Sequence, residues 1–457
     1  MRMRVDRFIR ITKGLDIKLK GSPQLIRTAY TSPKVAITPP DFKWITPQLI
    51  IEEGATVRVG DSLFIAKENP KISFVAPVSG TVTEIVRGEK RRITAIIIEK
   101  DNKNSTSITP EMIKEESPEK IVDTMLVTGV WSMIRQRPFG TIANPDQQPK
   151  AIYISCFDTA PLAPDLHYIL QDKGAQFAQG VKILSQLTKG NLYLTIPADH
   201  KPLEDWLQKE VLEKIDTSNI KVISFKGKHP AGNVGTQIHL VTPIQKGEVV
   251  WYVDPQHTAN IGTLFLQKQL DFSRTVALTG SEVKNPQYYD TMIGAALSEL
   301  IEEQVDIEFP RVVSGNLLTG RSVSKDGFIG FYDHQISVIS DDVQREFLGW
   351  MTPGLNKFSL SRTFLSFLMP KKEYVMDTRL HGGERALMFS DVYSRVFPFR
   401  LLPDQLLKAC ITKDLDLMEA LGIYEVIEED FALCEFVCPS KTNCQQIVHD
   451  ALWELVK

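Results

Sequence analysis

The chain has 457 residues, which is too long for one compact core, so we expect several domains. Its 53 lysines and arginines nearly balance 56 aspartates and glutamates, for a formal net charge of −3, so the composition gives no indication of nucleic-acid binding. Five cysteines without an export signal argue against a disulfide framework, and no apolar run reaches the roughly 18 residues of a membrane span.

The first domain is expected over residues 33–101, after an N-terminal segment of residues 1–32. Short alternating strands with glycine turns form two similar halves, which is typical of a biotinyl/lipoyl-like β-sandwich. The stretch IAKENPKISFVAPVSGTVTEIV resembles the hairpin that carries the modified lysine in such domains. The tip position holds Asn69, and Lys67 and Lys71 lie two residues out of register. We therefore expect a structural or docking domain without covalent biotin or lipoate.

Strand-like and helical runs alternate after residue 151. AIYISC, LYLTIP and IKVISF are apolar runs of strand length, and the segments between them have helical periodicity. This alternation predicts a parallel sheet covered by helices, so we assign residues 102–255 to a Rossmann-like α/β domain.

Two further units are expected towards the C-terminus. Residues 275–324 run strand, turn, strand, helix, strand, which is typical of a β-grasp (ubiquitin-like) domain, and we assign residues 256–330 to it. The tail from about residue 404 has helical periodicity, so residues 331–457 are assigned to a linker and a C-terminal helical domain. The expected fold class of the whole chain is multidomain α/β plus β.

The segment VTGVWSMIRQRPFG, residues 127–140, resembles a glycine-rich flavin loop. Similar segments open the flavin domain of the FMN-binding subunit of respiratory complex I and of the Rnf-type C subunit. Gly129 is retained, and the other positions that need small residues hold Ser132, Ile134, Arg135 and Arg137. Because a Cβ atom blocks close approach of the backbone to a ligand, we expect no bound flavin. We interpret the segment as a helix with its arginines at the surface or at an interface.

A group of cysteines near the C-terminus has part of a ferredoxin spacing. CEFVCP matches the C-x3-C-P piece that closes an iron–sulfur ligand set. The two upstream ligands would fall at Glu428 and Phe431, which supply no thiolate. We therefore expect Cys434, Cys438 and Cys444 to be buried or free thiols and the chain to hold no metal.

The loop FKGKHPAGNVGTQIH, residues 225–239, follows the third strand of the predicted α/β domain. Ligands usually bind at the carboxyl edge of such a sheet. His229 and His239 are therefore candidate ligand-binding residues, although a loop of this kind more often has a structural role.

An ordered set of motifs resembles one family nearly end to end. The motifs are ITKGLDIKLKGSPQ, APVSGTVTEIVRGEKRR, GVWSMIRQRPF, DTAPLAPD, HPAGNVGTQIH, LTGSEVKNPQ, RLHGGERA and EEDFALCEFVCPSK. They are similar to the A subunit of the Na+-translocating NADH:quinone oxidoreductase. The resemblance implies a peripheral subunit, without a transmembrane helix, on the cytoplasmic face of the bacterial inner membrane. It belongs to a six-subunit complex that oxidises NADH, reduces ubiquinone and exports Na+.

The resemblance also has implications for cofactors and quinone. FMN, FAD, riboflavin and iron–sulfur centres are expected on partner subunits and none on this chain, which is not expected to be active alone. A bound quinone needs hydrogen-bond donors at its carbonyl groups and a wall for its ring. The candidate quinone-binding residues are Trp131, Arg135, Arg137, Phe139, His229 and His239. We expect any such contact to be shared with a membrane subunit.

Two alternatives stay open. The chain could be an Rnf-like electron-transfer subunit that holds its own cofactor, or a cofactor-free scaffold protein. A visible colour after purification would indicate a bound cofactor and would therefore favour the first alternative. A biotin or lipoate carrier is disfavoured by Asn69, and the intact mass tests for it.

Overall fold

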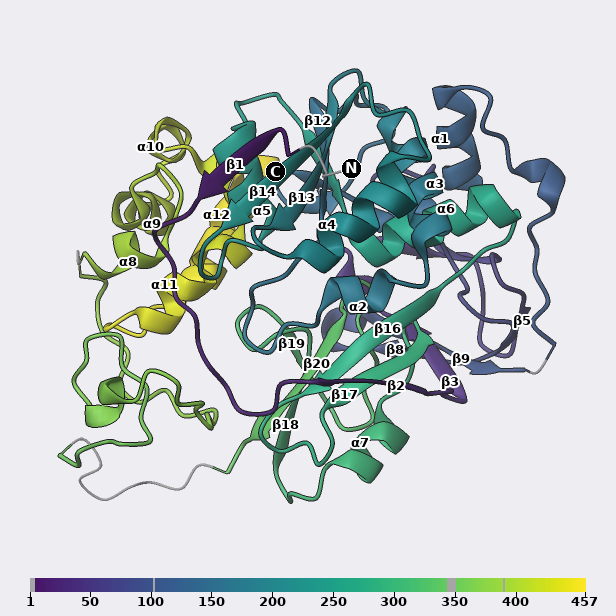
Figure 1. Cartoon of the computed structure of the whole chain (residues 1–457). Helices are drawn as coiled ribbons and strands as arrows, with labels where there is room; N and C mark the ends of the chain where they lie inside the picture. The colour runs from purple at the N-terminus through teal and green to yellow at the C-terminus, as the bar shows by residue number, and fades with distance from the viewer. Residues whose placement is uncertain (1–4, 102, 343–350, 389–390) are drawn as a thin grey trace.

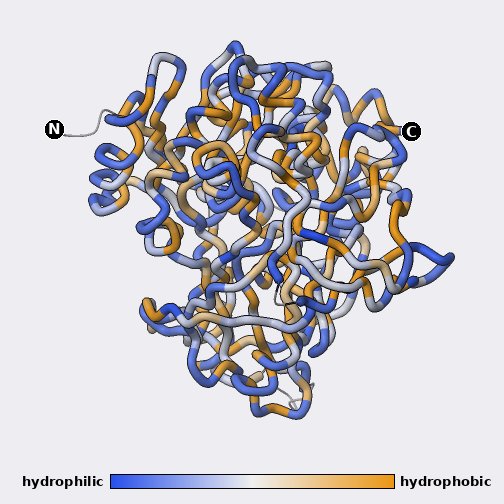
Figure 2. Tube along the Cα trace, turned by 90° about the vertical axis from the view of Figure 1, so that its right-hand side faces the viewer, coloured by the Kyte–Doolittle hydropathy of each residue, from blue (hydrophilic) through white to orange (hydrophobic). Residues whose placement is uncertain are grey.

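The computed structural model describes residues 5–101, 103–342, 351–388 and 391–457 (Figure 1). Within these ranges the strands form four sheets, and short helices make up most of the C-terminal part. Figure 2 shows hydrophilic residues at many outer turns and hydrophobic residues interspersed along the inner segments. The four sheets and the helices together make the described chain a mixed α/β protein.

A seven-stranded sheet has the order β1-β14-β13-β12-β15-β10-β11. The first five strands in this order run parallel, whereas β10 runs antiparallel to β15, and β11 runs antiparallel to β10. The strands are β1 (Arg7–Arg10), β10 (Ile134–Arg137), β11 (Thr141–Ile142), β12 (Ala151–Ser155), β13 (Asn191–Pro197), β14 (Ile220–Lys226) and β15 (Val250–Val253). The helix expected within residues 127–140 is wrong, because β10 carries Arg135 and Arg137 after a short 3-10 turn.

Helices cover both faces of this sheet. Ile152 and Ile154 of β12 share a core with Phe177, whereas Tyr153 shares a different core with Ile238. Because alternate residues of a strand point to opposite faces, α3 and α6 lie on one face and α5 on the other. The helices of this unit are α1 (Pro118–Val127), α2 (Leu166–Leu170), α3 (Gly174–Ser185), α4 (Lys201–Leu207), α5 (Val234–Val241) and α6 (Pro255–Gln267).

Helices α3 and α6 pack closely because each has a glycine at their contact. A Cβ atom on Gly180 would lie 1.9 Å from the carbonyl oxygen of Thr258, and one on Gly262 would lie 1.7 Å from that of Gln176. Gly262→Ala should therefore force the helices apart and lower the free energy of unfolding by about 1–3 kcal/mol, as measured by urea denaturation. Gly383→Ala, which has nothing within 4 Å of the added carbon, is the control. Equal stability of the two variants would contradict this explanation.

A six-stranded sheet has the order β19-β18-β20-β16-β17-β2. Its central hairpin of β16 and β17 is followed by α7, which packs Leu300 and Ile301 against Val276 and Val338 of the sheet. The elements are β2 (Gln24–Ala29), β16 (Ser273–Thr279), β17 (Gln287–Met292), α7 (Ser298–Gln304), β18 (Pro310–Ser314), β19 (Arg321–Val323) and β20 (Gln335–Ser340). Since β1 joins the first sheet and β2 joins this one, the N-terminal segment, purple in Figure 1, links the two sheets.

Two small sheets share one core, and one of them contains the hairpin that resembles the lysine-carrying hairpin of a biotinyl/lipoyl domain. One has the order β3-β9-β8-β5 and the other β4-β6-β7. The strands are β3 (Lys34–Ile37), β4 (Pro47–Leu49), β5 (Thr56–Val57), β6 (Ser62–Ala66), β7 (Ser73–Val75), β8 (Gly80–Arg87) and β9 (Ile93–Lys100). Asn69 lies in the turn between β6 and β7, where its side-chain oxygen accepts from the Lys71 backbone N–H at 3.2 Å. The Lys71 ammonium pairs with Asp146 at 2.6 Å, so this tip is tied to the neighbouring unit.

The C-terminal helices form their own core. They are α8 (Val392–Val396), α9 (Pro403–Thr412), α10 (Leu415–Ala420), α11 (Ala432–Val437) and α12 (Cys444–Val456). Leu15, Ile17 and Leu19 of the N-terminal segment are part of this core, which fixes the helices to the rest of the chain. In the described part of the chain, no helix is both long enough and apolar enough to cross a membrane.

The three clustered cysteines are buried in this core as free thiols. The Tyr393 hydroxyl lies 2.8 Å from Cys438 Sγ, and the Thr442 backbone N–H donates to the same sulfur at 3.3 Å. Burial raises the pKa of the Cys434 and Cys444 thiols, the latter to about 12. Among the described residues, no group of three or more His, Cys, Asp or Glu side chains is placed to hold a metal ion.

Candidate functional site

A cavity of about 190 Å³ lies where the parallel strands of the seven-stranded sheet end. Ser155 is the last residue of β12 and Asp158 lies just beyond it, Asp254 follows β15, and the loop after β14 supplies His229. Carboxyl ends of parallel strands meet at one edge, so these residues come together although they are far apart in sequence. Residues 332–335 of the six-stranded unit and Glu429 of the C-terminal part complete the wall, so three parts of the chain build the cavity.

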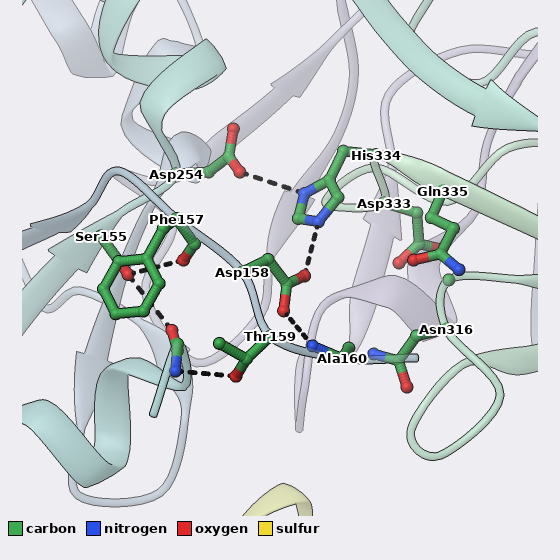
Figure 3. A network of polar contacts seen from close by, with 12 residues as sticks. Ser155, Phe157, Asp158, Thr159, Ala160, Asp254, Asn316, Asp333, His334 and Gln335 are labelled. Atoms are coloured by element: carbon green, nitrogen blue, oxygen red, sulfur yellow. Dashed lines mark hydrogen bonds and ion pairs between the residues drawn. The ribbon is translucent and has the colours of Figure 1, made fainter. Parts of the chain in front are cut away.

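His334 lies between two aspartates of the sheet edge (Figure 3). Its Nε2 atom is 3.0 Å from Asp158 Oδ2, and its Nδ1 atom is 3.4 Å from Asp254 Oδ2. Burial alone lowers the pKa of His334, but the hydrogen bond and negative charges of the two aspartates outweigh it and raise the pKa to about 9. His334 is therefore an imidazolium at neutral pH and joins β20 to the ends of β12 and β15.

Asp254 is held by several donors at once. It caps α6 by accepting from the backbone N–H groups of Gln256 and His257, and it pairs with Arg274 at 2.8 Å. Burial opposes ionisation, but the charge of Arg274 and the contact with His334 lower the pKa of Asp254 well below its usual value. Arg274 also donates to the carbonyl oxygens of Tyr332 and Asp333. The wall of the cavity is thus a network of fixed charges.

Arg135 has guanidinium donors that form no hydrogen bond within the described part of the chain. Its guanidinium carbon lies 4.7 Å from the ring centre of Tyr252 and 4.3 Å from that of Tyr332. Register in the sheet explains one of these contacts, because Arg135 pairs with Tyr252 across β10 and β15. In the described residues the guanidinium has no hydrogen-bond partner, and it lines the cavity. A ligand that brings an acceptor oxygen into the cavity would find these N–H groups unoccupied.

Comparison with known proteins shows the family of the chain. Family models match the NqrA N-terminal barrel-sandwich hybrid domain over residues 9–101, the NqrA second alpha/beta domain over residues 116–270 and the NQRA C-terminal domain over residues 275–325. The A subunit of the Na(+)-translocating NADH-quinone reductase of Rhodopirellula baltica is 36% identical over 451 residues, covering 97% of each chain. The chain belongs to this family. The family predicted from the ordered motifs is therefore confirmed.

Further A subunits of the family match over nearly the whole chain. That of Pasteurella multocida is 36% identical over 454 residues, covering 98% of this chain and 99% of the relative. That of Yersinia pestis is 34% identical over 452 residues, with the same coverage. Among solved structures, an NAD+-reducing [NiFe]-hydrogenase in the H2-reduced state has a TM-score of 0.40 and 11% identity, covering 76% of this chain and 62% of that one. A similarity this weak carries no argument.

His229 is the second predicted residue that lines the cavity. Its side chain is buried, and its Nδ1 atom lies 3.2 Å from Thr159 Oγ1. Burial lowers the pKa of His229 to about 4 against the opposing charges of Asp158 and Asp16, so the ring is neutral at physiological pH. A neutral imidazole can offer one donor and one acceptor nitrogen.

Arg137 lies behind the cavity wall in this NqrA-family chain. Its side chain is 1% exposed and pairs with Glu429 at 2.5 Å and Asp430 at 2.6 Å. Burial alone would lower the pKa of Arg137, but these two acids outweigh it and raise the pKa. Because Glu429 lines the cavity, Arg137 acts on the site through that carboxylate.

The other three predicted residues lie away from the cavity. Trp131 is buried in the core, where its Nε1 atom donates to the Ala143 carbonyl oxygen at 2.8 Å. Phe139 contacts Trp44 near the C-terminal helices. His239 is fixed at both ring nitrogens, with Nδ1 2.6 Å from Glu425 and Nε2 accepting from the Arg400 backbone N–H. The structure thus brings Arg135 and His229 together and gives the other residues packing or positioning contacts.

The retained glycine of the flavin-like segment serves packing. Gly129 has φ +75, and a Cβ atom added to it would lie 2.4 Å from Cγ1 of Val75 in the N-terminal domain. The positions of the two missing cysteine ligands are also occupied by protein contacts. Glu428 pairs with Lys43, and Phe431 lies in the C-terminal core. At both cofactor-like motifs these residues therefore make packing or ion-pair contacts within the protein.

Proposed function

We propose that the chain is the peripheral A subunit of a complex that oxidises NADH, reduces ubiquinone to ubiquinol and exports Na+. The observation that supports this most strongly is the family match over 97% of both chains. Its partners are the other members of a six-subunit complex, especially a membrane subunit, which carry FMN, FAD, riboflavin and iron–sulfur centres. The chain is proposed to lie on the cytoplasmic face of the bacterial inner membrane.

We propose finer folds and domain limits for its parts. Residues 33–101 form a biotinyl/lipoyl-like domain after the segment 1–32, residues 102–255 a Rossmann-like domain, and residues 256–330 a β-grasp domain. Residues 331–457 form a linker and the C-terminal helical domain. The parallel strands with helices on both faces support the second assignment, and the hairpin followed by α7 supports the third.

We also propose that the cavity at the sheet edge receives the quinone head group. Arg135 supplies unoccupied donors for a quinone carbonyl, and Tyr252 and Tyr332 supply a wall for the ring. The cavity of about 190 Å³ is smaller than the roughly 300 Å³ at which ordinary ligand pockets begin, so it suits a ring without its isoprenoid tail. The tail would lie against a membrane subunit.

The remaining predicted residues contribute to the proposed site through wall, positioning or packing contacts. His229 contributes a neutral ring at the cavity wall. Arg137 fixes Glu429, while Trp131 and Phe139 hold the segments on either side of β10. His239 fixes α5 against the C-terminal part.

Arg135→Leu should weaken quinone binding in the assembled complex by roughly 10- to 100-fold, because a hydrogen bond from a charged donor is lost. Titration of NADH-dependent quinone reduction with a short-chain ubiquinone measures this as a rise in KM. Arg58→Leu removes an exposed arginine far from the cavity and is the control. If both variants keep the wild-type KM, the proposed contact is wrong.

Reconstitution tests the role of the whole chain. A complex prepared without this subunit should regain NADH–ubiquinone reductase activity when the purified chain is added, whereas the chain alone should not oxidise NADH, because hydride transfer needs a flavin. Steady NADH oxidation by the chain alone, with flavin absorbance that survives gel filtration, would favour the Rnf-like alternative. Full activity of the complex without the chain would leave only a scaffold role.

A further inference from the structure

Residues 351–372 expose an unusual density of apolar side chains. Leu368 and Met351 are 65% and 64% exposed, and Leu355, Leu365 and Phe367 are each more than two-fifths exposed. Single exposed apolar residues are normal on a protein surface, but a contiguous group marks an interaction surface. In Figure 1 this segment is part of the light-green lobe below α8 and α11, at the margin of the molecule.

The exposed side chains belong to a segment that is anchored elsewhere. Phe358 contacts Phe436 and Tyr374, with ring centres 5.7 Å and 5.5 Å apart, and packs against the C-terminal core. The Tyr374 backbone N–H donates to the Lys18 carbonyl oxygen at 2.8 Å. The segment thus buries one set of apolar residues and presents a second set to the outside.

The same segment has a charge that differs from that of the whole chain. Residues 351–372 contain Lys357, Arg362, Lys371 and Lys372 and no aspartate or glutamate, whereas the chain has a formal net charge of −3. A hollow of about 400 Å³ beside the segment is lined by Lys371 and by Lys18 of the N-terminal segment, with Glu373 as its acidic group. A segment that exposes apolar side chains and whose charged residues are all cations suits the interface of an anionic membrane.

We propose that residues 351–372 dock the protein on an anionic lipid surface. Leu365, Phe367 and Leu368 enter the interface between headgroups and acyl chains, and Lys371 and Lys372 contact the lipid phosphates. The inference deepens the proposed peripheral placement and rests on it. It also gives the chain a membrane contact of its own, beside the contact with a membrane subunit.

Sedimentation of the purified full-length chain with lipid vesicles tests the proposal. The chain should bind vesicles of phosphatidylcholine with phosphatidylglycerol far more tightly than vesicles of phosphatidylcholine alone, and added salt should release it. Removing two charges by Lys371→Gln and Lys372→Gln should weaken binding roughly 30-fold, since each lysine near an anionic surface contributes about 1 kcal/mol. Phe367→Ser with Leu368→Ser should abolish binding.

Matched variants control for general charge and hydrophobicity. Lys90→Gln with Arg92→Gln removes two exposed cations, and Leu25→Ser with Ile26→Ser removes two exposed apolar residues elsewhere. Both controls should bind as the wild type does. Equal losses in controls and test variants, or no preference for the anionic vesicles, would overturn the proposal.

The outcome that competes with lipid docking is that residues 351–372 contact a partner protein. In that case the purified chain leaves both kinds of vesicle unbound, and a photoreactive residue at position 367 labels a partner protein in the assembled complex. That result would overturn lipid docking and leave the proposed function intact. Failure of the proposed function shows separately, as a chain that does not restore activity to the complex.

Discussion

Replacing Arg137 with methionine should lower the free energy of unfolding by about 3–5 kcal/mol, because removal of one partner leaves the buried Asp430 carboxylate without its counter-charge. The Arg137 side chain is 1% exposed, and the Asp430 carboxylate that it pairs with at 2.6 Å is fully buried. Methionine keeps much of the apolar volume of the arginine side chain but supplies no charge and no donor. Urea denaturation of the full-length chain measures the loss.

Arg395→Met is the matched control for this experiment. Its pair with Asp391 joins side chains that are 60% and 74% exposed, and exposed pairs contribute little to stability. The control should therefore lie within about 1 kcal/mol of the wild type. Similar losses in the two variants would contradict the conclusion that Arg137 joins β10 to the C-terminal part through a buried ion pair.

The stability of the chain should fall by about 3 kcal/mol between pH 6.5 and pH 9 through His334 alone. In the folded chain the pKa of His334 is raised from its ordinary value of 6.5 to about 9 by Asp158 and Asp254, against the effect of burial. The stabilisation is therefore complete below pH 6.5 and is lost as the pH rises through about 9. Denaturation curves recorded across this range measure the decline.

His334→Gln separates this effect from other titrations. Glutamine can still hydrogen-bond but carries no charge, so the variant should be less stable near pH 6.5 and approach the wild type above pH 9. His229, whose pKa burial lowers to about 4, has the opposite sign and destabilises the fold only as the pH falls below 6.5. If the stabilities of the variant and the wild type differed by the same amount at every pH, His334 would not stabilise the contact between β20 and the sheet edge through its charge.

The sequence predicted the order of elements well where periodicity was strong. AIYISC, LYLTIP and IKVISF became β12, β13 and β14, since long apolar runs between helical segments leave few alternatives. The segment IRQR was assigned to a helix because its polar residues do not show the apolar pattern of a buried strand. Ile134 and Arg137 are buried, and Arg137 is accepted there only because Glu429 and Asp430, almost 300 residues away, neutralise it. The local sequence pattern around β10 gives no indication of this long-range ion pair.

Part of the candidate site follows a rule that can be applied to the sequence alone. Asp158 comes shortly after the predicted strand AIYISC, so the carboxyl-edge argument that selected His229 could have selected it too. Asp254 follows β15, which was not predicted as a strand from the sequence. His334 and Tyr332 carry no such signal, because they reach the cavity from another sheet. The ion pair of Glu429 with Arg137 could not be predicted for the same reason, since it depends on how the C-terminal part packs against β10.

Photo-crosslinking of a ubiquinone analogue in the assembled complex, followed by peptide mapping, tests most directly whether this chain holds the quinone head group. We expect label on this chain in peptides that contain Arg135, Tyr252 or His229, and competition by unlabelled ubiquinone. The label should fall sharply in the Arg135→Leu complex, while the Arg58→Leu complex retains it. Labelling confined to membrane subunits, with unchanged quinone kinetics in Arg135→Leu and His229→Gln complexes that still assemble, would contradict a quinone site in this cavity.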